Sequence, residues 1–217
     1  MKKTVSGIII LLLFSSAISA QLVTKRDYSA AIAIQAGGAV NLFLPDRLSD
    51  INIQPTAGLK MTFPFNREWF MGAEINYNVL RLTNNNIYFP GDQPEDSEPL
   101  KLKIHQVQVP LYVKRMLRSN RASLLFGGYF AWNYDHKFTG PKEGSVLYEG
   151  DEPEKWEAGL LIGFEQNLAK GLDLTVKVCG GLKNLHKNGE TDQKSYPVQA
   201  NLTLSYRLLR LGGCKCD

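Results

Sequence analysis

Several features that would mark an enzyme, a metalloprotein or a helical membrane protein are missing from this chain. After residue 20 it has no second long apolar run, whereas a membrane-spanning helix needs about 20 apolar residues. It contains three histidines, no nucleophile motif accompanies them, and neither a metal site nor a cofactor is predicted. Cys214 and Cys216 are too close for an easy unstrained bridge, and Cys179 falls within an apolar segment. No disulfide framework is expected, and the role of Cys214 and Cys216 stays open.

The first 20 residues have the pattern of a secretory signal. Lysines at positions 2 and 3 precede an apolar run over residues 7–14, and small residues follow as far as Ala20. A basic start, a short apolar stretch and a small residue at the cut are typical of a signal peptide. We therefore predict a signal peptide over residues 1–20 and one mature domain over residues 21–217.

The chain also lacks a large excess of charge. Its formal net charge of +4 falls to +2 once the two lysines of the leader are removed (4 − 2 = 2), so no nucleic-acid partner is expected. The hydrophobic content of 44% and the mean hydropathy of −0.19 are ordinary. A transmembrane β-barrel shares such values, because only every second residue of each strand faces lipid.

What the mature chain does have is alternation of apolar and polar residues. Alternate side chains of a strand point to opposite faces, so this pattern predicts β-strands. Eight such segments cover residues 29–41, 53–63, 69–79, 100–114, 123–138, 156–165, 173–183 and 198–207. The pattern changes phase within the fourth segment, which predicts a β-bulge near His105. The facing of the fifth segment is ambiguous, and Pro55 fits only a bulge or a strand start.

The connections between these segments alternate in length. Long ones cover residues 45–52, 83–99, 139–155 and 184–195, and short ones cover 64–67, 115–121 and 169–171. Short periplasmic turns and long outer loops are typical of outer-membrane barrels. The sequence therefore predicts an all-β fold, an eight-stranded antiparallel up-and-down transmembrane barrel in the outer membrane with both termini in the periplasm.

The alternative is a soluble ligand-binding barrel of the lipocalin type, which is apolar inside and polar outside. Aromatic residues near the ends of the apolar faces favour the membrane barrel, because such residues form girdles at the two membrane interfaces. These residues are Phe63, Trp69, Tyr77, Trp156 and Tyr206.

Three stretches carry a family resemblance: residues 105–114 (HQVQVPLYVK), residues 125–129 (LFGGY) and residues 156–163 (WEAGLLIG). They resemble the PorT-like outer membrane β-barrel porin family of Bacteroidota, over nearly the whole mature chain. The resemblance implies an eight-stranded barrel in a family that mostly lacks assigned chemistry. The tail over residues 212–217 departs from the usual aromatic barrel terminus, so the assembly signal lies internally at Tyr206 or is weaker.

Charged residues define two candidate sites. Five lie on the polar face of their strands, which is predicted to face the lumen: Lys60, Glu74, Glu165, Lys177 and Arg207. Opposite charges in a narrow interior are expected to pair, because an unpaired buried ion is costly, so an open porin is not expected. The predicted outer loops carry the second set: Asp92, Glu95, Asp96, Glu98, Glu149, Asp151, Glu152 and Glu154.

The acidic set suits either a cation-bridged surface glycolipid or a basic protein, because hard cations prefer carboxylate oxygens. Solvated loops without a specific role are the simpler interpretation of the same residues. We expect a structural or interaction role at the outer membrane, with membrane lipid, surface glycolipid and a protein of an envelope or secretion assembly as partners.

The competing class is an outer-leaflet lipid-modifying enzyme of the lipid A acylase or deacylase type. Its chemistry needs a histidine beside a hydroxyl or carboxylate partner. His105, His136 and His186 all map near the outer end, and Asp135 adjoins one of them. Because no nucleophile motif accompanies them, an enzyme is not expected.

Overall fold

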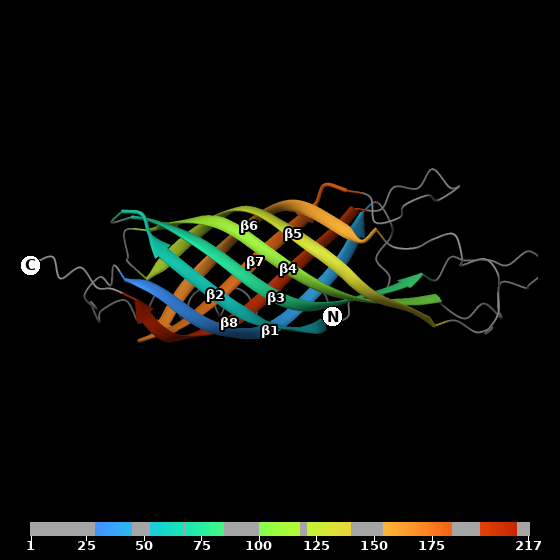
Figure 1. Cartoon of the computed structure of the whole chain (residues 1–217), viewed down its shortest axis with the longest axis horizontal. Helices are drawn as coiled ribbons and strands as arrows, with labels where there is room; N and C mark the ends of the chain where they lie inside the picture. The colour runs from blue at the N-terminus through green and yellow to red at the C-terminus, as the bar shows by residue number, and fades with distance from the viewer. Residues whose placement is uncertain are drawn as a thin grey trace, which may run out of the picture.

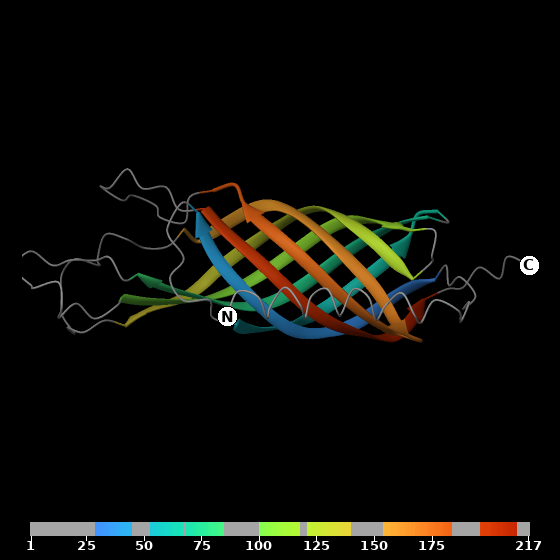
Figure 2. The same cartoon turned by 180° about the vertical axis from the view of Figure 1, so that it is seen from behind.

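A computed structural model describes residues 29–44, 53–66, 68–84, 100–117, 121–139, 154–183 and 196–211. They form eight strands: β1 (Ala30–Leu44), β2 (Ile53–Pro64), β3 (Trp69–Asn84), β4 (Leu100–Met116), β5 (Ala122–Thr139), β6 (Trp156–Ala169), β7 (Leu172–Gly181) and β8 (Tyr196–Leu211). Each strand pairs antiparallel with the next, and β8 pairs with β1, which closes the sheet into a barrel (Figures 1 and 2). The prediction of an eight-stranded antiparallel up-and-down barrel is confirmed.

The two ends of the barrel differ. The start of β1, the end of β8 and the short turns share one end, and the strand ends that border the long connections lie at the other (Figure 1). At that second end β3, β4 and β5 project beyond the other strands (Figure 1). Strands β3 and β5 run on to Asn84 and Thr139, so Thr83 and Thr139 are strand residues and not loop residues as predicted.

Several predicted features lie outside the described residues. They are the leader over residues 1–20, the tail with Cys214 and Cys216, His186, and seven of the eight loop acids (Asp92, Glu95, Asp96, Glu98, Glu149, Asp151 and Glu152). Among the residues that are described, no helix is long and apolar enough to cross a membrane.

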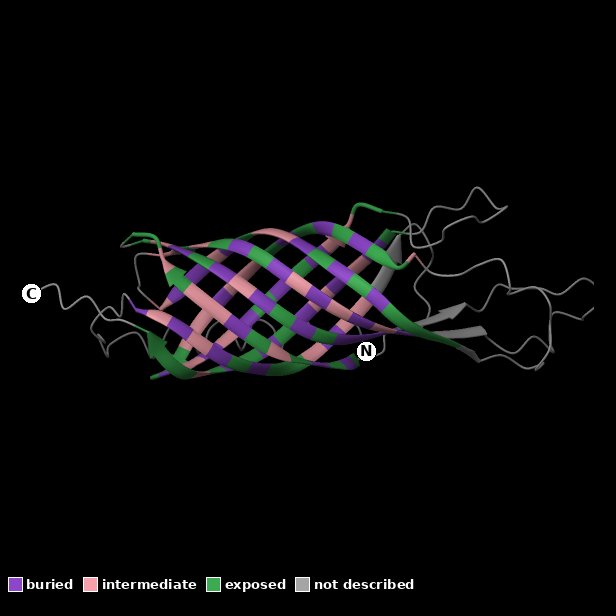
Figure 3. Ribbon diagram, in the orientation of Figure 1, coloured by how far each residue is buried: buried purple, intermediate pink, exposed green. Residues whose placement is uncertain are grey.

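Buried and exposed residues alternate along most of the barrel wall (Figure 3). The interior takes the polar residues: Gln35 is 4% exposed and Asn76 is 5% exposed. The exterior takes the apolar ones: Ile75 is 53% exposed and Leu202 is 50% exposed. This arrangement is the reverse of a lipocalin-like barrel, so the soluble alternative is not favoured.

The irregularity predicted near His105 is present, but β5 and not β4 carries it. The β4–β5 register passes from Gln106 opposite Asn133 to His105 opposite Asp135, which leaves Tyr134 as an extra residue on β5. Strand β4 keeps its alternation, so Ile104 points inward and is fully buried. A β-bulge of this kind inserts one residue into one strand only.

Two of the four prolines in the strands, Pro55 and Pro110, lie where a ladder bond is missing. Pro55 precedes the first β2–β3 pair, which is Thr56 with Asn78. Pro110 lies in β4 where the β3–β4 ladder has a gap between the pairs Ala73–Leu111 and Asn76–Gln108. Because proline has no amide hydrogen to donate, it is tolerated only at such places.

Candidate functional site

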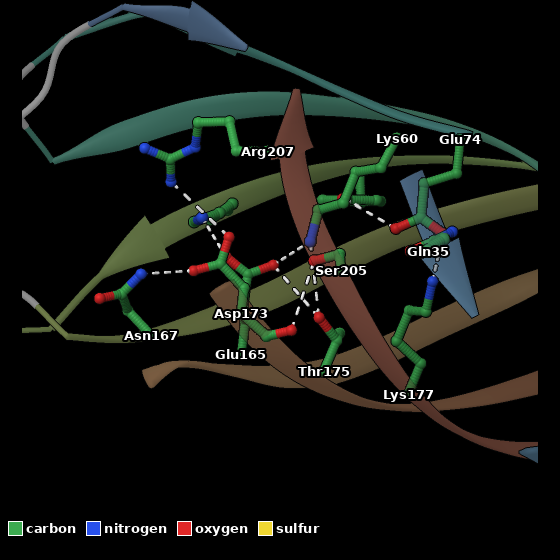
Figure 4. Close-up of polar contacts among 12 residues, drawn as sticks. Gln35, Lys60, Glu74, Glu165, Asn167, Asp173, Thr175, Lys177, Ser205 and Arg207 are labelled. Carbon is green, nitrogen blue, oxygen red and sulfur yellow. Dashed lines mark hydrogen bonds and ion pairs between the residues drawn. The ribbon is translucent and has the colours of Figure 1, made fainter. Parts of the chain in front are cut away.

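The polar interior holds two buried carboxylates that each accept several hydrogen bonds (Figure 4). The first is Glu74 of β3, which forms an ion pair with Lys177 of β7. Its carboxylate also accepts hydrogen bonds from Gln35 Nε2 at 2.8 Å, Asn76 Nδ2 at 2.9 Å and Tyr112 Oη at 2.9 Å. Four donors therefore surround one buried carboxylate.

The second carboxylate is Glu165 of β6. It forms ion pairs with two cations, Lys60 of β2 and Lys114 of β4. Thr175 Oγ1 donates a further hydrogen bond to it at 3.3 Å. A buried charge is stable only when such partners replace the lost water.

These ion pairs cross the barrel. In a closed barrel of eight consecutive strands, β2 lies opposite β6, and β3 lies opposite β7. Lys60 with Glu165 and Lys177 with Glu74 therefore connect opposite walls through the interior (Figure 4). The side chains of Lys60, Glu74, Glu165 and Lys177 are at most 3% exposed.

A third pair lies toward the end that carries the short turns. Arg207 of β8 has its Nη2 atom 3.6 Å from Asp173 Oδ2 of β7. Asn167 Nδ2 donates to the other oxygen of the same carboxylate at 2.7 Å. This pair is less buried than the other two, with side chains 22% and 10% exposed.

Two tyrosines in the interior each lie over a glycine on the neighbouring strand. Tyr112 is directly opposite Gly72, where an added Cβ would lie 2.1 Å from the tyrosine ring. Tyr129 is directly opposite Gly159, where a Cβ would lie 2.4 Å from the ring. The missing side chains leave room for each ring to lie flat across the strand, as in other aromatic–glycine pairs of sheets.

The hydroxyl group of each ring donates a hydrogen bond to the carboxylate of a glutamate two residues from the glycine. Tyr112 Oη donates to Glu74, and Tyr129 Oη donates to Glu157. Glu157 also accepts a hydrogen bond from Gln106 Nε2 at 3.1 Å. Within the described residues Glu157 has no cation within ion-pair distance, so neutral donors alone hold it.

The structure places all five predicted lumen charges inside the barrel and pairs each with an opposite charge. Lys114, Glu157 and Asp173 also face the interior but were not in the predicted charge set. Sequence reasoning also missed the two tyrosine–glycine pairs, since a tyrosine and the glycine it covers lie on different strands. The signal was present only in the glycines of the third and sixth segments.

The other candidate residues lie toward the end of the barrel opposite the short turns. Glu154 is the one described member of the acidic set; its Oε1 atom lies 3.1 Å from Lys183 Nζ. His105 and His136 lie on opposite faces of the sheet, because His136 pairs with the inward-facing Ile104. Over the described ranges no three His, Cys, Asp or Glu side chains are placed to hold a metal ion.

On the exterior of the barrel, aromatic side chains follow one cross-strand row near the end opposite the short turns. Tyr77 is opposite Val107, Val107 is opposite Trp132, and Trp132 is opposite Trp156. The two tryptophan rings stack with centroids 5.7 Å apart. His105 adjoins this row, with Nδ1 at 2.6 Å from Tyr77 Oη. We call Tyr77, His105, Trp132 and Trp156 the aromatic row.

Comparison with known proteins gives one family and several solved structures. The model of the family described as "Outer membrane protein beta-barrel domain" matches residues 18–187. The attachment invasion locus protein Ail of Yersinia pestis is 12% identical, covers 84% of this chain and 100% of its own, and has a TM-score of 0.47.

Two further solved structures are similar to a comparable degree. Neisserial surface protein A is 9% identical, with 85% of this chain and 100% of its own covered and a TM-score of 0.46. OprG from Pseudomonas aeruginosa is 11% identical, with 84% of this chain and 95% of its own covered and a TM-score of 0.43. Among curated proteins, none matches the chain.

Proposed function

Because the chain belongs to the outer membrane protein beta-barrel domain family, we propose that it is a plugged barrel with a structural or interaction role, and not an open porin. Its location is the outer membrane, as the family implies. We propose that both termini lie in the periplasm and that the long connections face outward. The short turns lie at the same end of the barrel as the start of β1 and the end of β8, which supports this orientation.

The ion pairs that cross the interior carry the proposal of a plugged barrel. Lys60 with Glu165 and Lys177 with Glu74 each occupy the width of the lumen between opposite walls. An eight-stranded barrel is just wide enough for side chains to fill. An ion entering this lumen would have to break buried pairs whose separated partners are poorly solvated.

Two observations support the interaction role. One is the acidic set of the long connections, which we propose engages a cation-bridged glycolipid or a basic protein surface. The other is the resemblance to PorT-like proteins, which supports membership in an envelope or secretion assembly. The lumen itself offers side chains that are already paired with one another, and no catalytic role is proposed for it.

The enzyme alternative is not favoured. His105 lies outside the barrel against Tyr77, whereas His136 lies on the inward face of the same sheet. The two histidines therefore cannot act on one substrate atom from these positions. Loss of activity on a lipid substrate after H105A or H136A would reverse this view.

Planar-bilayer recordings of the refolded full chain test the plugged lumen. We expect no large stable conductance from the wild type. A K60S/K114S/E165S variant, which replaces all three charged residues of one crossing cluster with neutral serines, should raise the conductance. Sustained porin-like conductance of the wild type would contradict the proposal.

Co-purification from detergent-extracted outer membranes tests the interaction role. Neutralising all eight loop acids together should weaken partner association and leave heat-modifiable folding intact. This variant is D92N/E95Q/D96N/E98Q/E149Q/D151N/E152Q/E154Q. The wild-type association should weaken as ionic strength rises, because salt screens exposed charges. Equal association by wild type and variant would show that the acidic set is only solvated surface.

A further inference from the structure

We propose that Arg81, Lys103 and Lys137 form a binding site for the phosphate groups of an outer-leaflet glycolipid. We call these three residues the basic row. The proposal rests on the orientation proposed above, in which the long connections face outward. It assigns a ligand to a surface that is separate from the acidic loop residues.

The strand register brings the three cations side by side. Arg81 of β3 is directly opposite Lys103 of β4, and Lys103 is directly opposite Lys137 of β5. Neighbouring strands are about 4.8 Å apart, so the three backbones span about 10 Å. Directly opposite residues share a face, and Lys103 lies two residues from the outward-facing His105, so the basic row faces outward.

Three like charges in adjacent register positions are unfavourable on their own. Like charges directly opposite one another destabilise a sheet. None of the three has an ion-pair or hydrogen-bond partner among the described residues. Asp135 is the described acid nearest in register on this face, opposite His105, and it forms no ion pair with them. An anionic ligand bound between the three cations would offset their mutual repulsion.

The position along the barrel points to a lipid headgroup. In outer-membrane barrels, aromatic residues on the barrel exterior lie at the membrane interface. In this barrel the aromatic row corresponds to that interface. Arg81 lies four residues beyond Tyr77 on the same strand. With a rise of about 3.3 Å per residue and a tilt of about 40°, the basic row lies roughly 10 Å beyond the aromatic row.

Long basic side chains can reach back from that level toward headgroups while their aliphatic stems stay near the apolar surface. The chemistry of the row fits phosphate in particular. An arginine guanidinium binds phosphate oxygens in a bidentate manner, and lysine supplies compact point charges beside it. Arg81 lies beyond Asn78, the last described β3 residue paired with β2, and Lys137 lies beyond Trp132, the last described β5 residue paired with β6. All three cations therefore lie on the part of β3, β4 and β5 that extends past the neighbouring strands.

The test uses the full chain folded into bilayers that contain a phosphorylated bacterial glycolipid, with the retained glycolipid quantified after purification in mild detergent. The variant is R81Q/K103Q/K137Q. The matched control, R115Q/K170Q/R210Q, removes three cations at the opposite end of the barrel, where Arg115 lies over the Trp69 ring at 5.4 Å. Heat-modifiable migration verifies that all three proteins fold.

Each cation near a membrane surface contributes about a fivefold gain in affinity. We therefore expect the R81Q/K103Q/K137Q variant to bind about 100-fold more weakly, which is about 3 kcal/mol at about 1.4 kcal/mol per tenfold. The control should bind as the wild type does. Wild-type binding should also weaken as salt rises.

Three results would overturn the inference. They are unchanged retention by the R81Q/K103Q/K137Q variant, equal retention of a dephosphorylated glycolipid, and displacement of the glycolipid by inorganic phosphate at equal concentration. The last would indicate a free-anion site. Orientation is tested separately by labelling K137C on intact cells with an impermeant maleimide. Failure to label would reject the orientation, and the inference with it, whereas labelling without glycolipid binding would reject the inference alone.

Discussion

Removing one partner of the Glu74–Lys177 pair should destabilise the barrel, and the two possible removals should differ in size. In E74Q the Lys177 ammonium is left in the interior without an opposite charge, and Glu74 is its one hydrogen-bond partner among the described residues. Stranding a buried charge in this way costs about 3–5 kcal/mol. We expect E74Q to lose free energy of unfolding in that range.

The reverse change should be milder. In K177M the Glu74 carboxylate keeps its three neutral donors, Gln35, Asn76 and Tyr112, at 2.8, 2.9 and 2.9 Å. Hydrogen bonds to a charged group contribute about 1.5–3 kcal/mol each, so the remaining charge stays substantially compensated. We expect a loss of about 2 kcal/mol for K177M.

The double variant E74Q/K177M should cost less than the sum of the two single changes, because it leaves no stranded charge. Urea unfolding in lipid vesicles, followed by tryptophan fluorescence and heat-modifiable migration, measures all three. E154Q is the control, because its partner Lys183 is 52% exposed and an exposed pair contributes below about 1 kcal/mol. Additive single effects, or a larger loss for K177M than for E74Q, would refute the reasoning.

Two further predictions concern packing and facing. G72A should cost about 1–3 kcal/mol, because the added Cβ would lie 2.1 Å from the Tyr112 ring, whereas G180A, whose Cβ meets nothing within 4 Å, should be far milder in the same unfolding assay. A nitroxide at Leu59 should be shielded from water-soluble quenchers in vesicles, and one at the 77% exposed Phe65 should not be. Equal quenching at the two positions would contradict a lipid-facing exterior.

The alternation of side chains explains why the strands and most of their facing were predictable. It is local information, because residues two apart in one strand share a face whatever the neighbouring strands do. The strand bounds agree to within a few residues. The change of phase in the fourth segment did not come from a bulge in that strand, because β4 keeps its alternation and its apolar Ile104 points inward. The ambiguity in the fifth segment also had a physical cause, since β5 carries aromatic residues on both faces: Tyr129 is buried inside, whereas Phe130 and Trp132 are exposed outside.

The partnerships between strands were not predictable from the same pattern. Which lumen cation meets which carboxylate depends on how the closed barrel brings together strands that are not neighbours in the sheet. Lys114 of β4 and Lys60 of β2 share Glu165 of β6 for this reason, although nothing near Lys114 in the sequence indicates it. The basic row and the tyrosine–glycine pairs likewise exist only across neighbouring strands.

Because of the bulge at Tyr134, the part of β5 toward Thr139 should tolerate the loss of one residue. Because Tyr134 has no partner of its own in the β4–β5 ladder, a chain that lacks it would keep His105 opposite Asp135 and Lys103 opposite Lys137. A one-residue deletion between Ser123 and Asn133 would instead turn every side chain on one side of it to the other face. Natural variation in the length of β5 should therefore concentrate at this one position, and related chains without the extra residue should still present a residue equivalent to Lys137 on the outward face.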